Sequence, residues 1–369
     1  MLPKSESPDL SPIPEFERDD VYWLPKGDII VTARGVGFKF NSTVLSRHSS
    51  VFQDLFYRAK AVATSQSVLH CPVVRLDDSA QAFRCVLDFL MTQREVAEER
   101  STDPFELAYW QIRMSLKYRI HPLFVAATER LERLRLTDEF LLYCASVNLQ
   151  PSPVNVKHAI IGLNLVRMVR RPSLLPTALI ACAQFTPEEL VKPVTLSDGT
   201  RLSLPKEDLA HCLEAPRILR DATVDVALRV FALPASAQCT RRDSGLCEEG
   251  LRRLSFRRLD DNLKPQPLGK QPFRLWSIDL ARLPDPYRLC SRCADMVQER
   301  EREIMRAKWA ELPCLLDVVA PGWPGSTCSR HCVNPSDSNV CEFDMDAEGE
   351  SDPEDSEPPT PSEDSRFDD

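Results

Sequence analysis

The stretch GDIIVTARGVGFKFNSTVLSRHSSVFQDLF, residues 27–56, contains the clearest structural signal in this chain of 369 residues. A short β-branched run, residues 28–31, precedes Arg34-Gly35, and in residues 36–40 an apolar side chain stands at every second position. Apolar alternation on both sides of a glycine-containing turn is typical of a β-hairpin, because glycine adopts positive φ at little cost. Residues 28–40 are therefore predicted to form two antiparallel strands.

Two short helices are predicted directly after this hairpin. Asn41 or Ser42 can cap a first helix and Ser49 or Ser50 a second one, because their side-chain oxygens accept hydrogen bonds from helical N–H groups. The second helix would carry four apolar side chains at helical spacing, namely Val51, Phe52, Leu55 and Phe56.

These elements contain the motifs of a known family. Asp28 opens the first strand, residues 38–40 read F-x-F, a V-L pair occupies residues 44–45, and residues 49–56 read S-x-x-F-x-x-L-F. With these motifs the chain resembles the BTB (POZ) domain, and the nine residues before and including Asp28, DVYWLPKGD, resemble the version found in a large group of fungal BTB proteins. That group also carries a helical region and paired cysteines further along the chain.

The resemblance implies an α+β fold with several parts. Residues 20–135 would form a BTB/POZ α/β module and residues 137–232 a mainly helical, BACK-like region. Residues 233–320 would form a helical module that contains cysteines. Composition predicts disorder in residues 1–19 and in an acidic tail, residues 321–369, because polar, charged segments cannot bury enough apolar surface to fold.

The same resemblance implies a non-enzymatic protein–protein interaction module. Such a protein serves as a scaffold through homo- or hetero-oligomerisation, or as a transcription co-regulator, and would bind partners through helix faces and an exposed strand around residues 28–40. The alternative use, as substrate adaptor of a cullin-type ubiquitin ligase, normally needs a hydrophobic-x-Glu element before the third strand. Residues 63–70 contain no acidic side chain, so the scaffold function is preferred over the cullin adaptor.

Three residues bear on self-association. In dimeric BTB domains the aspartate of the first strand is typically joined by a basic residue at a second position. Here Asp28 is present, the second position is Ser42, and Arg47 lies nearby in the sequence. Because a buried carboxylate without a cation is costly, either Asp28 is exposed or another base serves it. The homodimer is thereby put in question, whereas the protein-binding role is not.

The net charge of −9 arises in the C-terminal tail. Residues 342–369 contain thirteen acidic side chains and one arginine, so the remaining residues carry a net charge of +3. No apolar run approaches the ~20 residues that span a bilayer, and residues 1–14 contain no hydrophobic signal segment. An intracellular protein of the nucleus or cytoplasm is expected, with no membrane partner and with its thirteen cysteines reduced or bound to metal.

The chain between residues 68 and 231 is predicted to be mostly helical. A third strand is expected at residues 68–76, and Ser79 caps the next helix. Asp103-Pro104 begins a helix in which Glu106 would reach back to complete a capping box. The Asp-Gly pair at residues 198–199 predicts a second hairpin. Further helices are expected at residues 138–147, 154–170, 173–184, 205–219, 221–231 and 294–309.

Four cysteines form a candidate structural zinc site: Cys239, Cys247, Cys290 and Cys293. Four thiolates complete a tetrahedral shell, and a C-x2-C pair at a helix start points two sulfurs at one cation. The wide spacing of the first pair leaves an alternative open, in which these are buried free thiols of a helical core. A second group, Cys328, His331, Cys332 and Cys341, lies in loop-like sequence and is more typical of a reduced, flexible segment.

Basic runs at residues 167–171 and 251–258 suggest a DNA- or RNA-binding regulator as a hypothesis of another class. No aromatic interleaving or recognition-helix pattern accompanies these runs, so nucleic acid is the less favoured partner. The sequence contains no Gly-rich phosphate loop, H-E-x-x-H or G-x-S-x-G motif, and a four-cysteine zinc shell leaves no position open for catalysis. The chain is therefore predicted not to be an enzyme.

Overall fold

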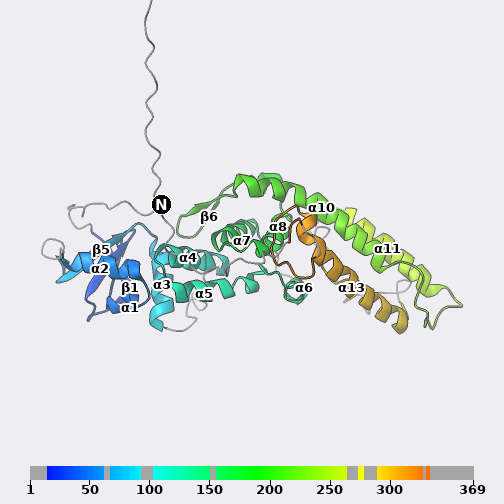
Figure 1. Cartoon of the computed structure of the whole chain (residues 1–369), viewed down its shortest axis with the longest axis horizontal. Coiled ribbons are helices and arrows are strands. Elements are labelled where there is room, and N and C mark those ends of the chain that lie inside the picture. Colours follow the sequence, from blue (N-terminus) through cyan, green and yellow to red (C-terminus); the bar gives the residue numbers. More distant parts are fainter. Residues whose placement is uncertain are drawn as a thin grey trace, which may run out of the picture. The chain divides into compact units, whose positions relative to one another are not determined.

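The chain has a mixed α+β architecture, with one sheet near the N-terminus and helices through most of the rest (Figure 1). The computed structural model describes residues 15–61, 67–92, 103–149, 155–263, 273–277, 289–326 and 330–332. All of these belong to one compact unit, Ile13–Asn334.

The predicted hairpin is confirmed. Strand β2 (Ile29–Ala33) pairs antiparallel with β3 (Val36–Phe40), and the two turn residues between them, Arg34 and Gly35, have φ values of 40° and 84°. Positive φ at both central positions defines the turn whose twist matches that of the flanking strands. Every side chain of β2 is buried, because this strand lies in the interior of the sheet.

The sheet has five strands in the order β1-β3-β2-β5-β4. Strand β5 (Cys71–Leu76) runs parallel to β2, and the two-residue β4 (Ser67–Val68) pairs with β5 at one edge. The expected third strand is thus two short strands, which a turn with positive φ at Leu69 and His70 separates. The strands of residues 28–40 are central, so the prediction of an exposed docking strand there is wrong.

Strand β1 (Glu17–Trp23) forms the other edge, parallel to β3. Disorder was expected through residue 19, and this expectation is wrong for residues 17–19. Only every third side chain of the strand is buried, so its sequence lacks the alternation of an ordinary strand. Its position is fixed instead by polar contacts to a helix, since Tyr22 donates a hydrogen bond to Asp88 and Arg84 donates to Asp19.

Three helices cover the sheet: α1 (Thr43–Ser46), α2 (Ser50–Ala61) and α3 (Ala80–Thr92). The prediction of two short helices after the hairpin is confirmed, and the Ser49 hydroxyl accepts the cap hydrogen bond from the Phe52 N–H. Phe83 of α3 packs on Phe38, with ring centroids 5.1 Å apart, and on Phe52 at 6.1 Å. The aromatic side chains of β3, α2 and α3 therefore share one core.

Two further helices follow, α4 (Pro104–Lys117) and α5 (His121–Glu129). Asp103 caps α4 as predicted, accepting a hydrogen bond from the Phe105 N–H at 2.9 Å. The capping box is wrong, because Glu106 turns into the protein and is 1% exposed. Its carboxylate accepts hydrogen bonds from the N–H and hydroxyl of Ser197 and forms an ion pair with Lys157.

The middle of the chain contains α6 (Phe140–Leu149), α7 (Val156–Met168), α8 (Leu175–Cys182) and α9 (Pro187–Val191), with short 3₁₀ helices at Glu132–Leu134 and Pro172–Leu174. The second predicted hairpin is confirmed as β6 (Val194–Thr195) and β7 (Arg201–Leu202), with Gly199 at φ +81°. Through Ser197 the turn of this hairpin contacts α4.

Helix α10 (Lys206–Val230) is continuous, whereas two separate helices were predicted at residues 205–219 and 221–231. A proline inside a helix costs ~3 kcal/mol, and α10 contains Pro216. An uninterrupted buried stripe offsets that cost, because burial of several side chains on one face stabilises the helix on both sides of the proline. Its members include Cys212, Ala215, Leu219, Val226 and Val230.

Helices α11 (Leu246–Leu263) and α13 (Ser291–Leu315) both pack on α10. Trp309 of α13 lies 5.2 Å from Tyr143 of α6 and 4.8 Å from Trp323, measured between ring centroids. One apolar cluster therefore continues across residues 232 and 233, where the sequence suggests a domain boundary. The described helices include none with the length and apolarity that crossing a membrane requires.

The predicted start of the tail at residue 321 is also wrong, because residues 321–326 and 330–332 belong to the folded unit. Trp323 is buried and donates from Nε1 to the carbonyl of Trp309 at 2.7 Å, and the Ala320 N–H donates to the carbonyl of His331. The predicted disorder of residues 1–14 and 333–369 concerns segments outside the described residues.

Gly27 gives a test of the close packing beside β3. A Cβ at this position would lie 2.7 Å from the backbone nitrogen of Phe40, which cannot move without disrupting the strand. Gly27→Ala is expected to lower the free energy of unfolding by about 1–3 kcal/mol.

Gly162→Ala in α7 is the matched control. Its added Cβ would meet neighbours no nearer than 3.6 Å, and alanine favours a helix over glycine by about 0.5–1 kcal/mol. Urea unfolding of both variants should shift the midpoints in opposite directions, and equal midpoints would contradict the packing described for Gly27.

Candidate metal centre and interaction surface

The four predicted cysteine ligands come together from three segments. Cys239 lies in the turns between α10 and α11, Cys247 in the first turn of α11, Cys290 at the N-cap of α13 and Cys293 in its first turn. Their sulfur atoms all lie within 4.8 Å of one another, and three of the residues are buried while Cys239 is half-buried. The structure thus brings together residues that are up to 54 positions apart in the sequence.

The geometry fits a tetrathiolate shell. Zinc–sulfur bonds of about 2.3 Å place tetrahedral sulfurs about 3.8 Å apart, and the Sγ atoms of Cys239 and Cys290 are separated by 3.9 Å. Two backbone N–H groups point at the sulfurs, that of Cys290 at Cys247 Sγ and that of Arg241 at Cys239 Sγ, each at 3.4 Å. The four cysteines could therefore bind a metal ion, which favours the metal over the interpretation as dispersed core thiols.

The electrostatics of the cluster favour negative charge on one sulfur, that of Cys290. Burial opposes ionisation of Cys290, but hydrogen bonds from the backbone and hydroxyl of Thr240 and from Cys293 lower its pKa to about 6. Burial raises the pKa of Cys247 and of Cys293, and the neighbouring thiols add to the effect. Cys290 is therefore the cysteine that ionises most easily, whereas Cys247 and Cys293 need a cation beside them before they lose their protons.

The second predicted Cys/His group is only partly described, since Cys328 and Cys341 lie outside the described residues. His331 Nε2 is 2.9 Å from the carboxylate of Asp317, and the side chain of Cys332 packs against the apolar core. Within the part of the chain that the structure describes, the four-cysteine cluster alone gathers three or more potential metal ligands.

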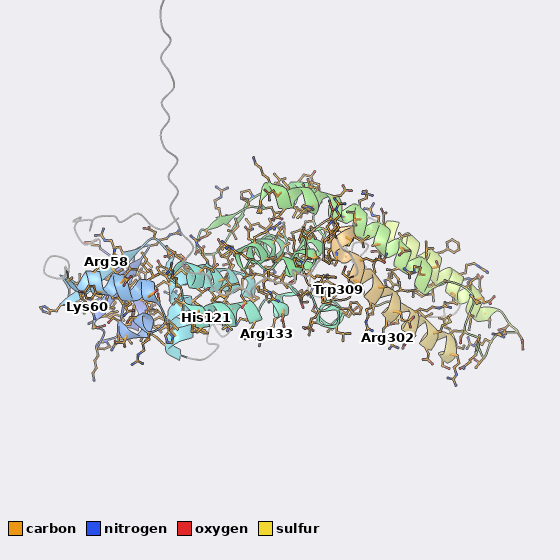
Figure 2. The ribbon with its side chains drawn as sticks, in the orientation of Figure 1. Arg58, Lys60, His121, Arg133, Arg302 and Trp309 are labelled. Atoms are coloured by element: carbon orange, nitrogen blue, oxygen red, sulfur yellow. The ribbon has the colours of Figure 1, made fainter. Side chains whose placement is uncertain are left out.

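The predicted interaction residues form a polar group at the N-terminal module. Asp28 accepts hydrogen bonds from the N–H and the hydroxyl of Ser42, at 2.6 and 2.8 Å. The base that joins them is Lys60 of α2 (Figure 2), whose Nζ lies 2.9 Å from both side chains. Arg47 is exposed. Sequence reasoning missed Lys60 because it lies 32 residues from Asp28, although it extends from the helix whose start was predicted.

The basic runs are partly neutralised by ion pairs. Arg167 binds the buried carboxylate of Asp208, and Glu249 binds both Arg252 and Arg253. The side chains of residues 257 and 258 lie outside the described set. These intramolecular contacts reduce the positive charge that residues 167–171 and 251–258 can offer to phosphates.

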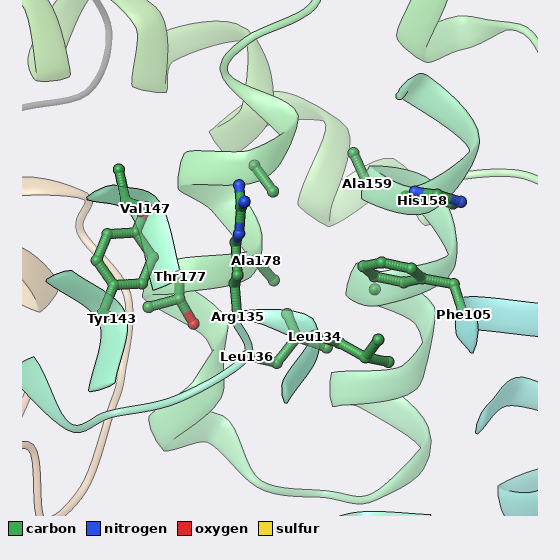
Figure 3. A pocket seen from close by; sticks show the side chains of 12 residues that line it. Phe105, Leu134, Arg135, Leu136, Tyr143, Val147, His158, Ala159, Thr177 and Ala178 are labelled. Carbon is green, nitrogen blue, oxygen red and sulfur yellow. The ribbon is translucent and has the colours of Figure 1, made fainter. Parts of the chain in front are cut away.

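A small cavity lies between the helices of the middle region (Figure 3). Arg135 projects into it between Tyr143 and the stacked rings of Phe105 and His158, whose centroids are 4.4 Å apart. Burial raises the pKa of Tyr143, an effect that Arg135 partly offsets. The cavity measures about 20 Å³, which is room for one water molecule, so this cavity is too small for a substrate.

Comparisons with protein-family models, with curated proteins and with solved structures found no match to this chain.

The Asp28 group predicts a loss of stability at low pH. Burial raises the pKa of Asp28, but hydrogen bonds from Ser42 and the Lys60 ammonium outweigh it and lower the pKa below its ordinary value. A carboxylate with a lowered folded-state pKa stabilises the fold above the unfolded value of about 3.9, and this stabilisation is lost as the pH falls through the folded value. Wild type should therefore lose more stability on acidification than Asp28→Asn.

Thermal unfolding midpoints at about pH 6 and about pH 3 measure this difference. Asp54→Asn is the control, because it removes an exposed carboxylate from α2, the helix that carries Lys60. Its unfolding midpoint should fall on acidification by as much as that of wild type. An identical acid response of Asp28→Asn and wild type would show that the contact with Lys60 carries no stability.

Proposed function

We propose that this chain is a non-enzymatic protein-interaction protein whose N-terminal module is of the BTB/POZ type. The observation that carries the proposal is the order of elements in residues 28–129: an antiparallel hairpin, two short helices, a strand parallel to the first, and then helices. That order places most of the large apolar side chains of residues 28–56 in one core. It leaves helix faces, and not the central strands, available for partners.

The outer face of α2 is the proposed contact surface. Tyr57 is 77% exposed and lies one helical turn before Lys60, whose ammonium pairs with Asp28. A tyrosine combines a large apolar ring with a polar hydroxyl and has few rotamers to immobilise, which makes it a common energetic centre of protein interfaces. The half-exposed ion pair beside it also offers charge complementarity to a partner.

We also propose that the metal held by the four cysteines is zinc and that its role is architectural. Four sulfur ligands select zinc among the common divalent ions, and a filled shell leaves no site for a water or substrate. The ion would join the segment after α10 to the first turns of α11 and α13. These contacts to two helix N-termini also place the anionic sulfurs where the helix dipoles favour them.

Zinc analysis tests the metal. Protein purified without chelator is expected to contain about one zinc ion per chain, and Cys293→Ser should lose most of it and unfold at a lower temperature. Cys314→Ser is the control, because Cys314 belongs to α13 but lies outside the cluster. Full zinc content in Cys293→Ser would refute the assignment of this site.

The Tyr57→Ala variant tests the proposed contact surface on α2, because it should lose binding to a partner or to a second copy of the chain. We expect the variant to reduce the dimer fraction in native mass spectrometry, or the recovery of a co-purified partner, by about tenfold or more. Leu141→Ala on α6 removes another strongly exposed side chain and should have no effect. A monomeric wild type with no partner that depends on Tyr57 would contradict the proposal.

Two measurements distinguish the competing functions, co-purification of partners and binding of labelled DNA. Recovery of a cullin with wild type and its loss with Tyr57→Ala would favour the ubiquitin-ligase adaptor over the scaffold. Tight binding of labelled duplex DNA, falling with salt at a slope of about −0.9 per phosphate contacted, would favour the nucleic-acid regulator instead.

A further inference from the structure

A second cavity lies directly beside the cysteine cluster. It measures about 530 Å³ and is bounded by the segment between α10 and α11, by the first turn of α11 and by α13. Cys239 and Cys247 contribute to its wall, so the proposed metal centre and the cavity share two residues. A volume of this size is typical of sites that bind a small molecule or a short piece of peptide.

Arginines are the most numerous charged side chains of the lining. Three arginines, Arg241, Arg242 and Arg300, line the cavity together with one carboxylate, that of Glu248. Arg242 donates a hydrogen bond to the carbonyl of Ala237 at 3.0 Å. Arg300 donates to the carbonyls of Ala232 and Pro234, at 2.5 and 3.2 Å.

These carbonyl contacts orient Arg242 and Arg300 without neutralising them. A carbonyl oxygen carries no net charge, so the guanidinium groups of Arg242 and Arg300 keep their positive charge while their side chains are already held in place. A ligand that binds them therefore does not need to immobilise freely rotating side chains, which would cost about 0.5–1.5 kcal/mol for each. Guanidinium groups with remaining N–H donors match carboxylate and phosphoryl oxygens.

We infer that this cavity is a binding site for an anionic peptide segment, one in which acidic or phosphorylated side chains follow one another closely. Arginines on two separate elements can contact more than one anionic group at once, which a single inorganic anion does not exploit. The volume exceeds that of one phosphate, and the cavity is partly open to solvent, which gives a chain access. The inference deepens the proposed interaction function by adding a second surface of defined chemistry.

A metal in the four-cysteine cluster would hold one wall of this cavity in place. The segment from Pro234 to Gly245 contains no strand or long helix, and it forms much of the wall. A metal bound to Cys239 and Cys247 fixes this segment against α11 and α13. Removal of a bound ion is therefore expected to weaken peptide binding, whereas the arginines that contact the peptide do not depend on the ion for their charge.

Fluorescence anisotropy with labelled decapeptides tests the site on the full, zinc-loaded chain. The probes are an alternating Ser-Asp peptide, its counterpart with phosphoserines, and a neutral Ser-Asn peptide. Either anionic peptide should bind and the neutral one should not, and the pair shows whether carboxylates alone suffice. A chain that ends after Asn334 is titrated in parallel, because the carboxylates of residues 342–369 can compete with the probe.

Arg300→Gln and Arg302→Gln form the decisive pair of variants. Arg300 lines the cavity, whereas Arg302 lies on the same helix α13 and pairs with Glu299 outside the lining (Figure 2). Arg300→Gln should raise the Kd of the anionic peptide about tenfold, and Arg302→Gln should leave it within about twofold of wild type. Equal zinc content in both variants shows that the wall remains intact.

Three results would overturn the inference: equal binding of anionic and neutral peptides, equal effects of the two variants, or tighter binding of a single-stranded decanucleotide that depends on Arg300. Measuring the zinc content distinguishes failure of the peptide-site inference from failure of the metal proposal. A chain without zinc that still binds the peptide through Arg300 refutes the metal and retains the site. A zinc-containing chain that binds no anionic peptide refutes the site alone.

Discussion

The aromatic contacts of Phe83 hold the N-terminal module together. This side chain of α3 packs on Phe38 and Phe40 of β3 and on Phe52 of α2, and all four residues are fully buried. Aromatic pairs of this kind contribute about 0.5–1.5 kcal/mol each beyond the burial of their surface. Because these rings are buried against one another, their packing sets the position of α2 and therefore of Tyr57 and of Lys60, which contacts Asp28.

A buried carboxylate joins this module to the helices that follow. Glu106 of α4 is held by Ser197 of the β6–β7 turn and by Lys157 of α7, while Arg34 of the β2–β3 turn donates to the carbonyl of Asp198. A buried charge without partners would cost several kcal/mol, so the second hairpin is needed where it lies. The small β6–β7 hairpin thus connects two regions that the resemblance treats as separate domains.

The cysteine cluster has a comparable role near the end of the folded unit. Helices α11 and α13 pack on α10 through apolar side chains, whereas the segment between α10 and α11 has little apolar surface to bury. Bringing four sulfurs together provides the fixed point that this segment lacks, and it arranges Arg241 and Arg242 on the same side as Arg300. The four-cysteine cluster and the arginine-lined cavity are therefore two consequences of one arrangement.

The sequence alone determined the features that depend on neighbours in the chain. Gly35, the β-branched run of β2 and the alternating residues of β3 specify the first hairpin. Asp103 and Pro104 specify the start of α4, and the Asp-Gly pair specifies the second hairpin. The four cysteines were identified by residue type and by the C-x2-C spacing at a helix start. In each case the deciding interaction is local, so a window of a few residues contains it.

Tertiary structure decided what depends on partners far along the chain. Strand β1 has no strand-like pattern and is fixed by Asp88 and Arg84, Glu106 left its helix cap for Ser197, and α10 continues through Pro216 because its buried stripe does. Lys60, and not Arg47, lies beside Asp28 because α2 packs against the sheet at β5 and brings its last turn to this carboxylate. Burial rewards contacts between residues that the chain brings together in three dimensions, and no local pattern records which those will be.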